Sequence, residues 1–249
     1  MTESSERDKK DPDAAAKSKA KLGASMRVTM RELIDARKPE AGIAAAKHRL
    51  RAWQNERFAR TYADLAAQPR YKAAVHFFLT ELYGDKDMSA RDADLERVLP
   101  LMIKLMPTPA LQTIRDALAF EALGERLDAD VARHLVGTKL TEESYGDAFR
   151  ACGQPSLRRR QIEHVERVGR ALDRLTRWPM VGTTLRLMRV PASSAGFGVL
   201  QVFLERGFTA FRQMRGASEF LATIVERETA IVERLFAGYP RPFELEDKS

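Results

Sequence analysis

The sequence predicts an all-α protein, folded as a single orthogonal bundle of roughly eight to ten helices. Apolar side chains recur every three or four residues along most of the chain, the spacing that places them on one face of a helix. Strand signals are missing, because the chain has neither β-branched alternation nor Asn-Gly and Asp-Gly turns. Proline and glycine residues divide it into helix-length segments, and we find no repeat period typical of solenoids.

Both ends of the chain are predicted to lie outside this bundle. Residues 1–25 carry six basic and five acidic side chains and almost no branched apolar ones. Such a segment cannot bury enough surface to offset its chain entropy, so we expect a disordered mixed-charge tail. Residues 26–238 are predicted to form one helical domain, and residues 239–249 a short C-terminal tail.

The most apolar stretch, KAAVHFFLTELYG at residues 72–84, is predicted to be the central helix. Its apolar side chains cover most of the helix circumference, which is typical of a helix surrounded by others. Ser89 with Asp92 resembles a capping box at the start of the next helix, and Pro100 should kink that helix. The other predicted helices span residues 27–37, 41–67, 111–136, 141–153, 157–178, 181–188, 199–214 and 218–236, with a loop at 190–198.

Composition predicts a cytoplasmic location. No apolar run approaches the roughly 18 to 20 residues that cross a bilayer, and the N-terminal MTESSERDKKDPD lacks the apolar segment of a secretory signal. The single cysteine, Cys152, excludes an internal disulfide framework and suits a reducing compartment.

Charged residues on apolar helix faces form the first candidate site. Glu228 falls in the middle of the apolar stripe of the last helix, where an unpaired carboxylate would be costly. Arg57 is the corresponding basic residue on the long helix at 41–67. Asp64, Glu81, Glu121 and Glu125 also lie beside apolar stripes. Two interpretations remain open: an internal salt-bridge network that fixes helix register, or a buried polar pocket gathering Arg57, Asp64, Glu81 and Glu228.

Metal and cofactor chemistry find no support in the sequence. The chain has no Glu-x-x-His pair of the kind used by di-metal bundles, and its four histidines show no metal-ligand spacing. It has neither a Gly-x-Ser-x-Gly elbow nor a Walker loop. Gly196-Phe197-Gly198 could offer backbone N–H groups to an anion, but we favour a tight loop in which the glycines allow close approach of the backbone. We therefore expect no metal and no cofactor, and assign no catalytic residue.

The second candidate site is a basic surface. From Leu157 to Arg189 nine arginines stand against three acidic residues, a net charge of +6 out of +7 for the chain. Six of these arginines have no acidic residue four positions before them and form a candidate anion-binding surface: Arg158, Arg159, Arg160, Arg174, Arg186 and Arg189. Nucleic acid is the weaker candidate partner, because few aromatic residues are interleaved with these arginines.

Four segments carry a resemblance to a known family. They are FFLTELYG at residues 77–84, RDADLERVLP at 91–100, LMRVPASSAGFGVLQVFLERGFTAFRQMRG at 187–216, and the pair Arg227 and Glu228. Together they resemble an uncharacterised bacterial family, the FFLEE-motif proteins, over about residues 51–236. The chain departs from the motif at Thr80, where a glutamate is expected, and retains Glu81. The resemblance implies an all-helical bacterial domain and brings no activity, ligand or catalytic residue.

These features favour a non-enzymatic interaction or regulatory domain. It would bind a protein partner or an anionic surface through the basic helix at residues 157–189. The alternative is a ligand-binding or enzymatic bundle whose buried polar pocket holds the carboxylates. The two classes separate on one observation: whether those carboxylates converge on an open cavity or are paired in a closed core. The oligomeric state stays open.

Overall fold

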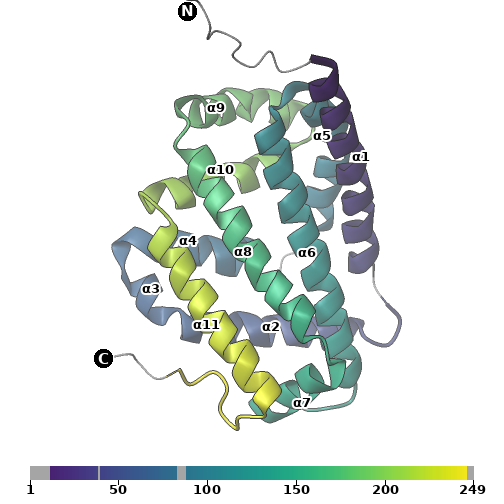
Figure 1. Cartoon of the computed structure of the whole chain (residues 1–249), viewed down its shortest axis with the longest axis vertical. Helices are drawn as coiled ribbons and strands as arrows, with labels where there is room; N and C mark the ends of the chain where they lie inside the picture. The colour runs from purple at the N-terminus through teal and green to yellow at the C-terminus, as the bar shows by residue number, and fades with distance from the viewer. Residues whose placement is uncertain (1–11, 39, 83–87, 246–249) are drawn as a thin grey trace, which may run out of the picture.

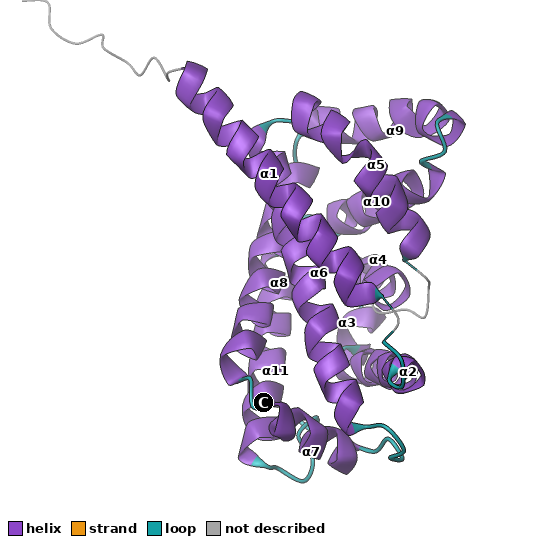
Figure 2. Cartoon of the chain, turned by 90° about the vertical axis from the view of Figure 1, so that its right-hand side faces the viewer, coloured by secondary structure: helices purple, strands orange, loops and turns teal. Residues whose placement is uncertain are grey.

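The computed structural model describes residues 12–38, 40–82 and 88–245. Within these ranges the chain forms eleven α-helices and one π-helical turn and contains no strand, so the all-α bundle is confirmed (Figures 1 and 2). The elements are α1 (Pro12–Arg37), α2 (Ala44–Thr61), α3 (Ala63–Ala67), α4 (Pro69–Phe77), the π-turn η1 (Phe78–Leu82), α5 (Ser89–Leu105), α6 (Thr108–His134), α7 (Glu142–Cys152), α8 (Pro155–Thr176), α9 (Pro179–Ser194), α10 (Gly198–Gln213) and α11 (Ser218–Ala237).

Two sets of helices cross each other. The long helices α6, α8 and α11 run along the longest axis of the molecule, with α1 beside α6 (Figure 1). The helices α2, α4, α9 and α10 run across them, and Figure 2 shows these on the side away from α8 and α11. Among the described residues, no helix is both long enough and apolar enough to cross a lipid bilayer.

The predicted central helix is α4 followed by η1. Tyr71, Ala74 and Val75 are buried against α10 and α11, where they meet Phe211 and Phe220. The stretch is not α-helical throughout, because residues 78–82 widen into a π-helical turn. Such turns occur often at functional sites. Residues 83 and 84 of the predicted helix lie outside the described residues.

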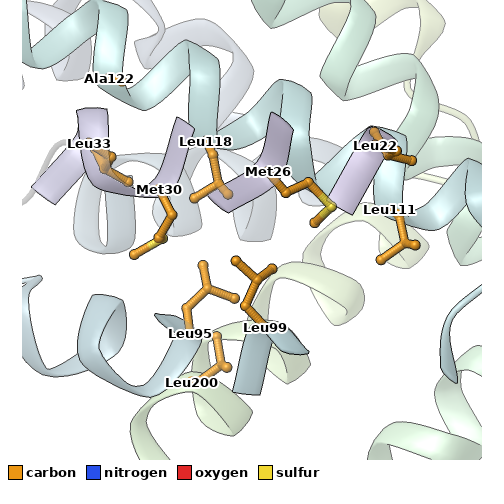
Figure 3. Close-up of a cluster of buried hydrophobic side chains, with 10 residues drawn as sticks. All are labelled: Leu22, Met26, Met30, Leu33, Leu95, Leu99, Leu111, Leu118, Ala122 and Leu200. Carbon is orange, nitrogen blue, oxygen red and sulfur yellow. The ribbon is translucent and has the colours of Figure 1, made fainter. Parts of the chain in front are cut away.

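The prediction of a disordered tail is wrong for residues 12–25. Residues 12–25 belong to α1, whose buried stripe begins at Leu22 and continues through Met26, Met30 and Leu33. Figure 3 shows these side chains facing Leu95 and Leu99 of α5 and Leu118 of α6. The stripe was missed because charged side chains dominate the composition around it. Residues 1–11 lie outside the described residues.

Other boundaries also differ from prediction. The helix expected over 41–67 breaks at Tyr62 into α2 and α3. The loop expected over 190–198 shrinks to 195–197, because α9 continues to Ser194 with Pro191 inside its last turn. Pro191 has no N–H to donate to the carbonyl of Leu187, four residues earlier, so α9 loses one backbone hydrogen bond there. At the C-terminus Pro242 is buried and the Phe243 ring packs against Trp53 and Tyr145, so residues 239–245 lie on the domain.

Candidate functional site

The carboxylate of Glu228 is paired inside the bundle. Arg57 of α2 donates to both of its oxygens, at 2.5 Å and 3.2 Å, and the Tyr62 hydroxyl donates to Oε1 at 2.7 Å. The Arg57 guanidinium also lies 3.8 Å from the centre of the Phe58 ring. The two charged residues that the apolar stripes singled out therefore pair with each other, and the Arg57 side chain is only 6% exposed. Its Nε atom has no hydrogen-bond partner among the described residues.

Asp64 and Glu81 do not join this pair. Asp64 accepts two hydrogen bonds from Arg227, at 2.7 Å and 2.8 Å, and its side chain is 52% exposed. Glu81 accepts from Arg206 of α10 at 2.5 Å. The predicted cluster of Arg57, Asp64, Glu81 and Glu228 is therefore three separate ion pairs. Periodicity places a residue on a helix face, but which faces meet depends on helix packing in space.

Glu81 borders a cavity. A pocket of about 440 Å³ lies between η1, α5 and the N-terminal half of α10. Its lining consists of Glu81, Met88, Arg91, Gly198, Val199, Val202, Phe203 and Arg206. We call this the η1–α10 pocket. It combines a mostly apolar wall with two arginines, and one of these, Arg91, is 4% exposed.

Arg91 belongs to a buried ionic network that links four helices. Arg37 of α1 pairs with Asp92, Glu121 and Glu125, and Arg91 pairs with Asp92 at 2.8 Å and Glu121 at 2.6 Å. On the other side, Lys47 reaches Glu125 at 2.8 Å and Arg51 pairs with it as well. Asp92 therefore holds α1 to α5 and does not cap the α5 N-terminus as its spacing from Ser89 suggested.

Burial and charge oppose each other in this network. Desolvation alone would raise the pKa of Glu125, but Arg51, Lys47 and Arg37 outweigh it and hold that pKa below its ordinary value. Of the side chains named in the network, four are cationic and three anionic. Consistent with this imbalance, Nη1 of Arg91 has no hydrogen-bond partner among the described residues.

Sequence reasoning flagged Glu121 and Glu125 but missed Arg37, Arg91 and Asp92. The signal was present, because Arg91 precedes Leu95 and Leu99 at four-residue spacing and so falls on the buried stripe of α5. The same test that singled out Glu228 would have found it. The role predicted for Asp92 was in a capping box with Ser89.

The predicted anion-binding surface needs one correction. Arg158 is 7% exposed, donates to the Leu127 carbonyl at 3.3 Å, and stacks over Phe149 at 4.5 Å. It therefore joins α8 to α6 and α7 and is not available to an external anion. A helical projection of α8 alone cannot show that α6 and α7 cover its first turn.

The remaining arginines of that surface do not form one patch. Arg159 and Arg160 lie at the start of α8, while Arg174, Arg186 and Arg189 lie at its end or on α9. At 1.5 Å per residue, Arg159 and Arg174 are about 22 Å apart along the helix axis. All five are exposed, and Arg189 donates to both oxygens of Glu205, at 3.0 Å and 2.7 Å.

The α9 end of this set borders a groove. A cavity of about 490 Å³ runs between α9 and α10, with Leu185 and Phe208 among its apolar residues. Four arginines and one glutamate line it: Arg186, Arg189, Arg212, Arg215 and Glu205. We call this the α9–α10 groove.

The outward side of α9 is unusual for a surface helix. Met180 is 78% exposed, Leu187 72% and Val190 73%. On a helical projection these three fall within an arc of roughly 80°, and the flank toward the groove carries Arg186 and Arg189. The helix contains no aspartate or glutamate. Trp178, just before α9, is also exposed.

The glycine loop before α10 is a structural turn. Gly196 has φ +78°, a left-handed conformation that favours glycine. Its carbonyl accepts from Arg97 at 2.9 Å, which ties the loop to α5. The N–H groups of Gly196 and Phe197 are used by the carbonyls of Ser193 and Ala192. These two N–H groups are therefore not directed at an anion.

Comparison with known proteins gives a family but no activity. No curated protein and no solved structure matches the chain. One family model, described as "Domain of unknown function (DUF8198)", matches residues 33–242. This span takes in the π-turn, the buried ionic network, the η1–α10 pocket and the α9–α10 groove. The chain therefore belongs to the family of the domain of unknown function DUF8198.

Proposed function

We propose that this protein is a non-enzymatic docking domain that attaches peripherally to an anionic phospholipid surface through α9. The observation that carries the proposal is the outward side of α9, where exposed Met180, Leu187 and Val190 stand beside two arginines without any carboxylate on the helix. A helix lying in a membrane interface buries its apolar side chains near the acyl chains and places arginine at the phosphate level.

The α9–α10 groove supplies the electrostatic part of this docking. Arg186, Arg212 and Arg215 line it in addition to the Glu205-paired Arg189. Each arginine close to an anionic leaflet contributes about 1 kcal/mol to binding. Trp178 adds a side chain of the type enriched at membrane interfaces.

A second copy of the chain fits this surface less well. A twofold dimer uses the same patch on both subunits, so arginines of α9 would meet arginines. A flat anionic surface, in contrast, neutralises Arg186 and its neighbours while receiving a convex apolar ridge. An acidic protein would also neutralise the arginines, but it would need a cavity shaped to receive Met180, Leu187 and Val190. A lipid layer needs no such cavity, because its acyl chains adapt to the apolar side chains.

The direct test is cosedimentation with vesicles of phosphatidylcholine alone or mixed with phosphatidylglycerol. We expect binding only to the mixed vesicles, weakening as salt rises because phosphate attraction is screened. Arg186→Glu should lower the partition constant roughly tenfold or more, and Leu187→Ser should lower it through lost apolar burial. Two exposed positions on α6 and beyond it give matched controls, Arg126→Glu and Val136→Ser.

The proposal fails if folded protein ignores anionic vesicles at low salt, or if the α9 variants bind as well as the controls. Light scattering that shows a dimer broken by Leu187→Ser would assign the ridge to a second copy instead. We also propose a cytoplasmic location for this protein. We further propose that it is one of the bacterial FFLEE-motif proteins, on the basis of FFLTELYG and the segments quoted above.

A further inference from the structure

We propose that the α9–α10 groove recognises a phosphomonoester headgroup, so that the lipid selected by this surface is phosphatidate. This inference rests on the docking function proposed above and names the lipid class that such docking would select. It follows from three arginines without partners, from the backbone at one of them, and from the chemistry of phosphate esters.

Three arginines of the groove have no acidic partner. Glu205 is the one carboxylate of the groove lining, and Arg189 donates to both of its oxygens, at 3.0 Å and 2.7 Å. Gln201 donates to Glu205 as well, at 2.9 Å. The other arginines of the lining make no hydrogen bond or ion pair with the described chain: Arg186, Arg212 and Arg215. The groove is therefore strongly positive, and its carboxylate is already occupied.

The close approach of α9 to α10 places two of these arginines on the same stretch of the groove (Figure 2). A Cβ atom at Gly182 would lie only 2.8 Å from the Phe208 ring and 3.5 Å from Nη1 of Arg212. The Arg212 guanidinium therefore lies against Gly182. Arg186 follows Gly182 by four residues, so it projects from the same face of α9 about one turn, or roughly 5.4 Å, further along.

Arg215 has a backbone conformation that does not suit its residue type. Its φ is +52°, and among the described residues it is the one non-glycine residue with a positive φ. This left-handed region is unfavourable for a residue with a Cβ atom and suits glycine. Residues held in such conformations cluster at ligand-binding sites. An exposed arginine at this position, lining the groove just after α10, is therefore better explained by binding than by folding.

The number of charges and donors favours a phosphomonoester over a phosphodiester. A monoester carries a charge of about −2 at pH 7 and three terminal oxygens, whereas the diester of phosphatidylglycerol carries a single charge and two terminal oxygens. Each guanidinium presents a planar fork of donors to phosphate oxygens. Arg186, Arg212 and Arg215 can each meet an oxygen of a monoester, and Thr209 and Gln213 add further donors to the lining.

The exposed apolar side chains of α9 favour a lipid over a soluble phosphate ester. Val190 follows Arg186 by four residues, so the two side chains are neighbours on the helix surface. A phosphate bound at Arg186 would therefore bring the acyl chains of its lipid next to Val190 and Leu187, both of which are exposed. A soluble ester would leave these side chains in water.

Cosedimentation with two sets of vesicles tests the inference. One contains phosphatidate and the other phosphatidylglycerol, each mixed with phosphatidylcholine and matched in total negative charge. We expect the full chain to bind the phosphatidate vesicles about tenfold more tightly. Arg212→Gln should abolish this preference, whereas Arg126→Gln, at an exposed position of α6, should leave it unchanged. The ratio of the two affinities cancels the general attraction that any arginine exerts on an anionic surface.

Arg215→Gly provides a readout that a structural role would not give. It should weaken the preference for phosphatidate, while the melting temperature stays the same or rises because glycine suits the positive φ. Arg215→Ala, which keeps the Cβ atom, should weaken the preference to the same extent. The inference is overturned if folded Arg212→Gln and Arg215→Gly proteins keep the preference of the unaltered chain.

The same experiment separates this inference from the docking function. Equal binding to the two sets of vesicles would overturn the phosphomonoester assignment and leave docking intact, whereas binding to neither set would overturn both. Glycerol 3-phosphate, the headgroup without its acyl chains, distinguishes the lipid from a soluble ester. Calorimetric titration should show that it binds the chain at least about tenfold more weakly than phosphatidate vesicles do; equal affinity would overturn the lipid assignment.

Discussion

The two ends of the molecule differ in where they place residues that do not suit their position on a helix. At the α2–α7–α11 end, charged residues that fall on apolar stripes are closed in, and Arg57 and Glu228 pair with each other beside aromatic rings. At the α5–α9–α10 end (Figure 2), apolar residues of a kind usually buried in a core face outward.

This difference separates architecture from candidate function. A carboxylate that the fold itself pairs, such as Glu228, needs no outside partner, whereas Leu187 and Val190 remain exposed to water in the described chain. Unresolved mismatches are therefore better guides to a binding site than unusual residues as such. Substitutions at the two ends should behave accordingly.

The largest effect should come from Glu228→Ala. It leaves the Arg57 guanidinium buried without its carboxylate, and breaking a buried pair in this way costs about 3–5 kcal/mol. Urea unfolding followed by circular dichroism measures the loss. Glu233→Ala, an exposed position on the same helix, is the control and should change stability little. An equal effect of both variants would contradict the closed pair.

Tyr62→Phe should have an intermediate effect. It removes the 2.7 Å hydrogen bond to Glu228 while leaving the Arg57 pair in place. Hydrogen bonds to charged groups contribute about 1.5–3 kcal/mol, so the free energy of unfolding should fall by that amount. A double-mutant cycle with Glu228→Gln should show coupling between the two positions; additive effects would mean that they act independently.

Glu125 should make a smaller contribution to stability, and the free energy of unfolding should depend on its ionisation only at acidic pH. Its pKa is lower in the folded chain than in the unfolded chain, so ionised Glu125 stabilises the fold above the unfolded pKa of about 4.3. That stability is lost as pH falls through the folded pKa. The difference in unfolding free energy between the unaltered chain and Glu125→Gln should therefore be constant near neutrality and narrow below about pH 4. A constant difference down to pH 3 would contradict the paired carboxylate.

The smallest effect on stability should come from Leu187→Ser and Val190→Ser. Both side chains are more than 70% exposed, so each change should stay within about 0.5 kcal/mol. Thermal melting provides the measurement, and Leu50→Ala, at a fully buried position, is the contrast, with an expected loss of about 2–5 kcal/mol. A large loss at Leu187 would mean that the ridge is part of the core.

Much of the fold could be predicted, because the spacing of apolar residues indicates helices and proline and glycine indicate where they end. The all-α class and most helix positions followed from local pattern alone, as did the need of Glu228 for a partner. The spatial pairing did not follow. Asp64 lies close in sequence to Arg57 yet pairs with Arg227, because α3 turns away from α2 at Tyr62.

The candidate pocket lay further beyond prediction. Its wall combines η1 and α5, which are neighbours in the sequence, with α10, which begins only at Gly198, and no local pattern predicts that contact. The prediction that Arg158 binds an external anion was wrong for a related reason. A helical projection of α8 places Arg158 on the outer side, but α6 and α7 cover it in the fold. Periodicity describes one helix at a time, and sites are built where several helices meet.

The π-turn η1 makes this part of the chain tolerant of a one-residue deletion. A π-turn accommodates one more residue per turn than the α-helix around it. Deleting a single residue such as Thr80 would let the turn close into an α-helix and leave the flanking residues in nearly the same orientation, because five π-helical residues turn the chain about as far as four α-helical ones. The same deletion inside a regular α-helix rotates every later side chain of that helix by about 100°. At this segment the loss of one residue should therefore be less disruptive than in the α-helices around it.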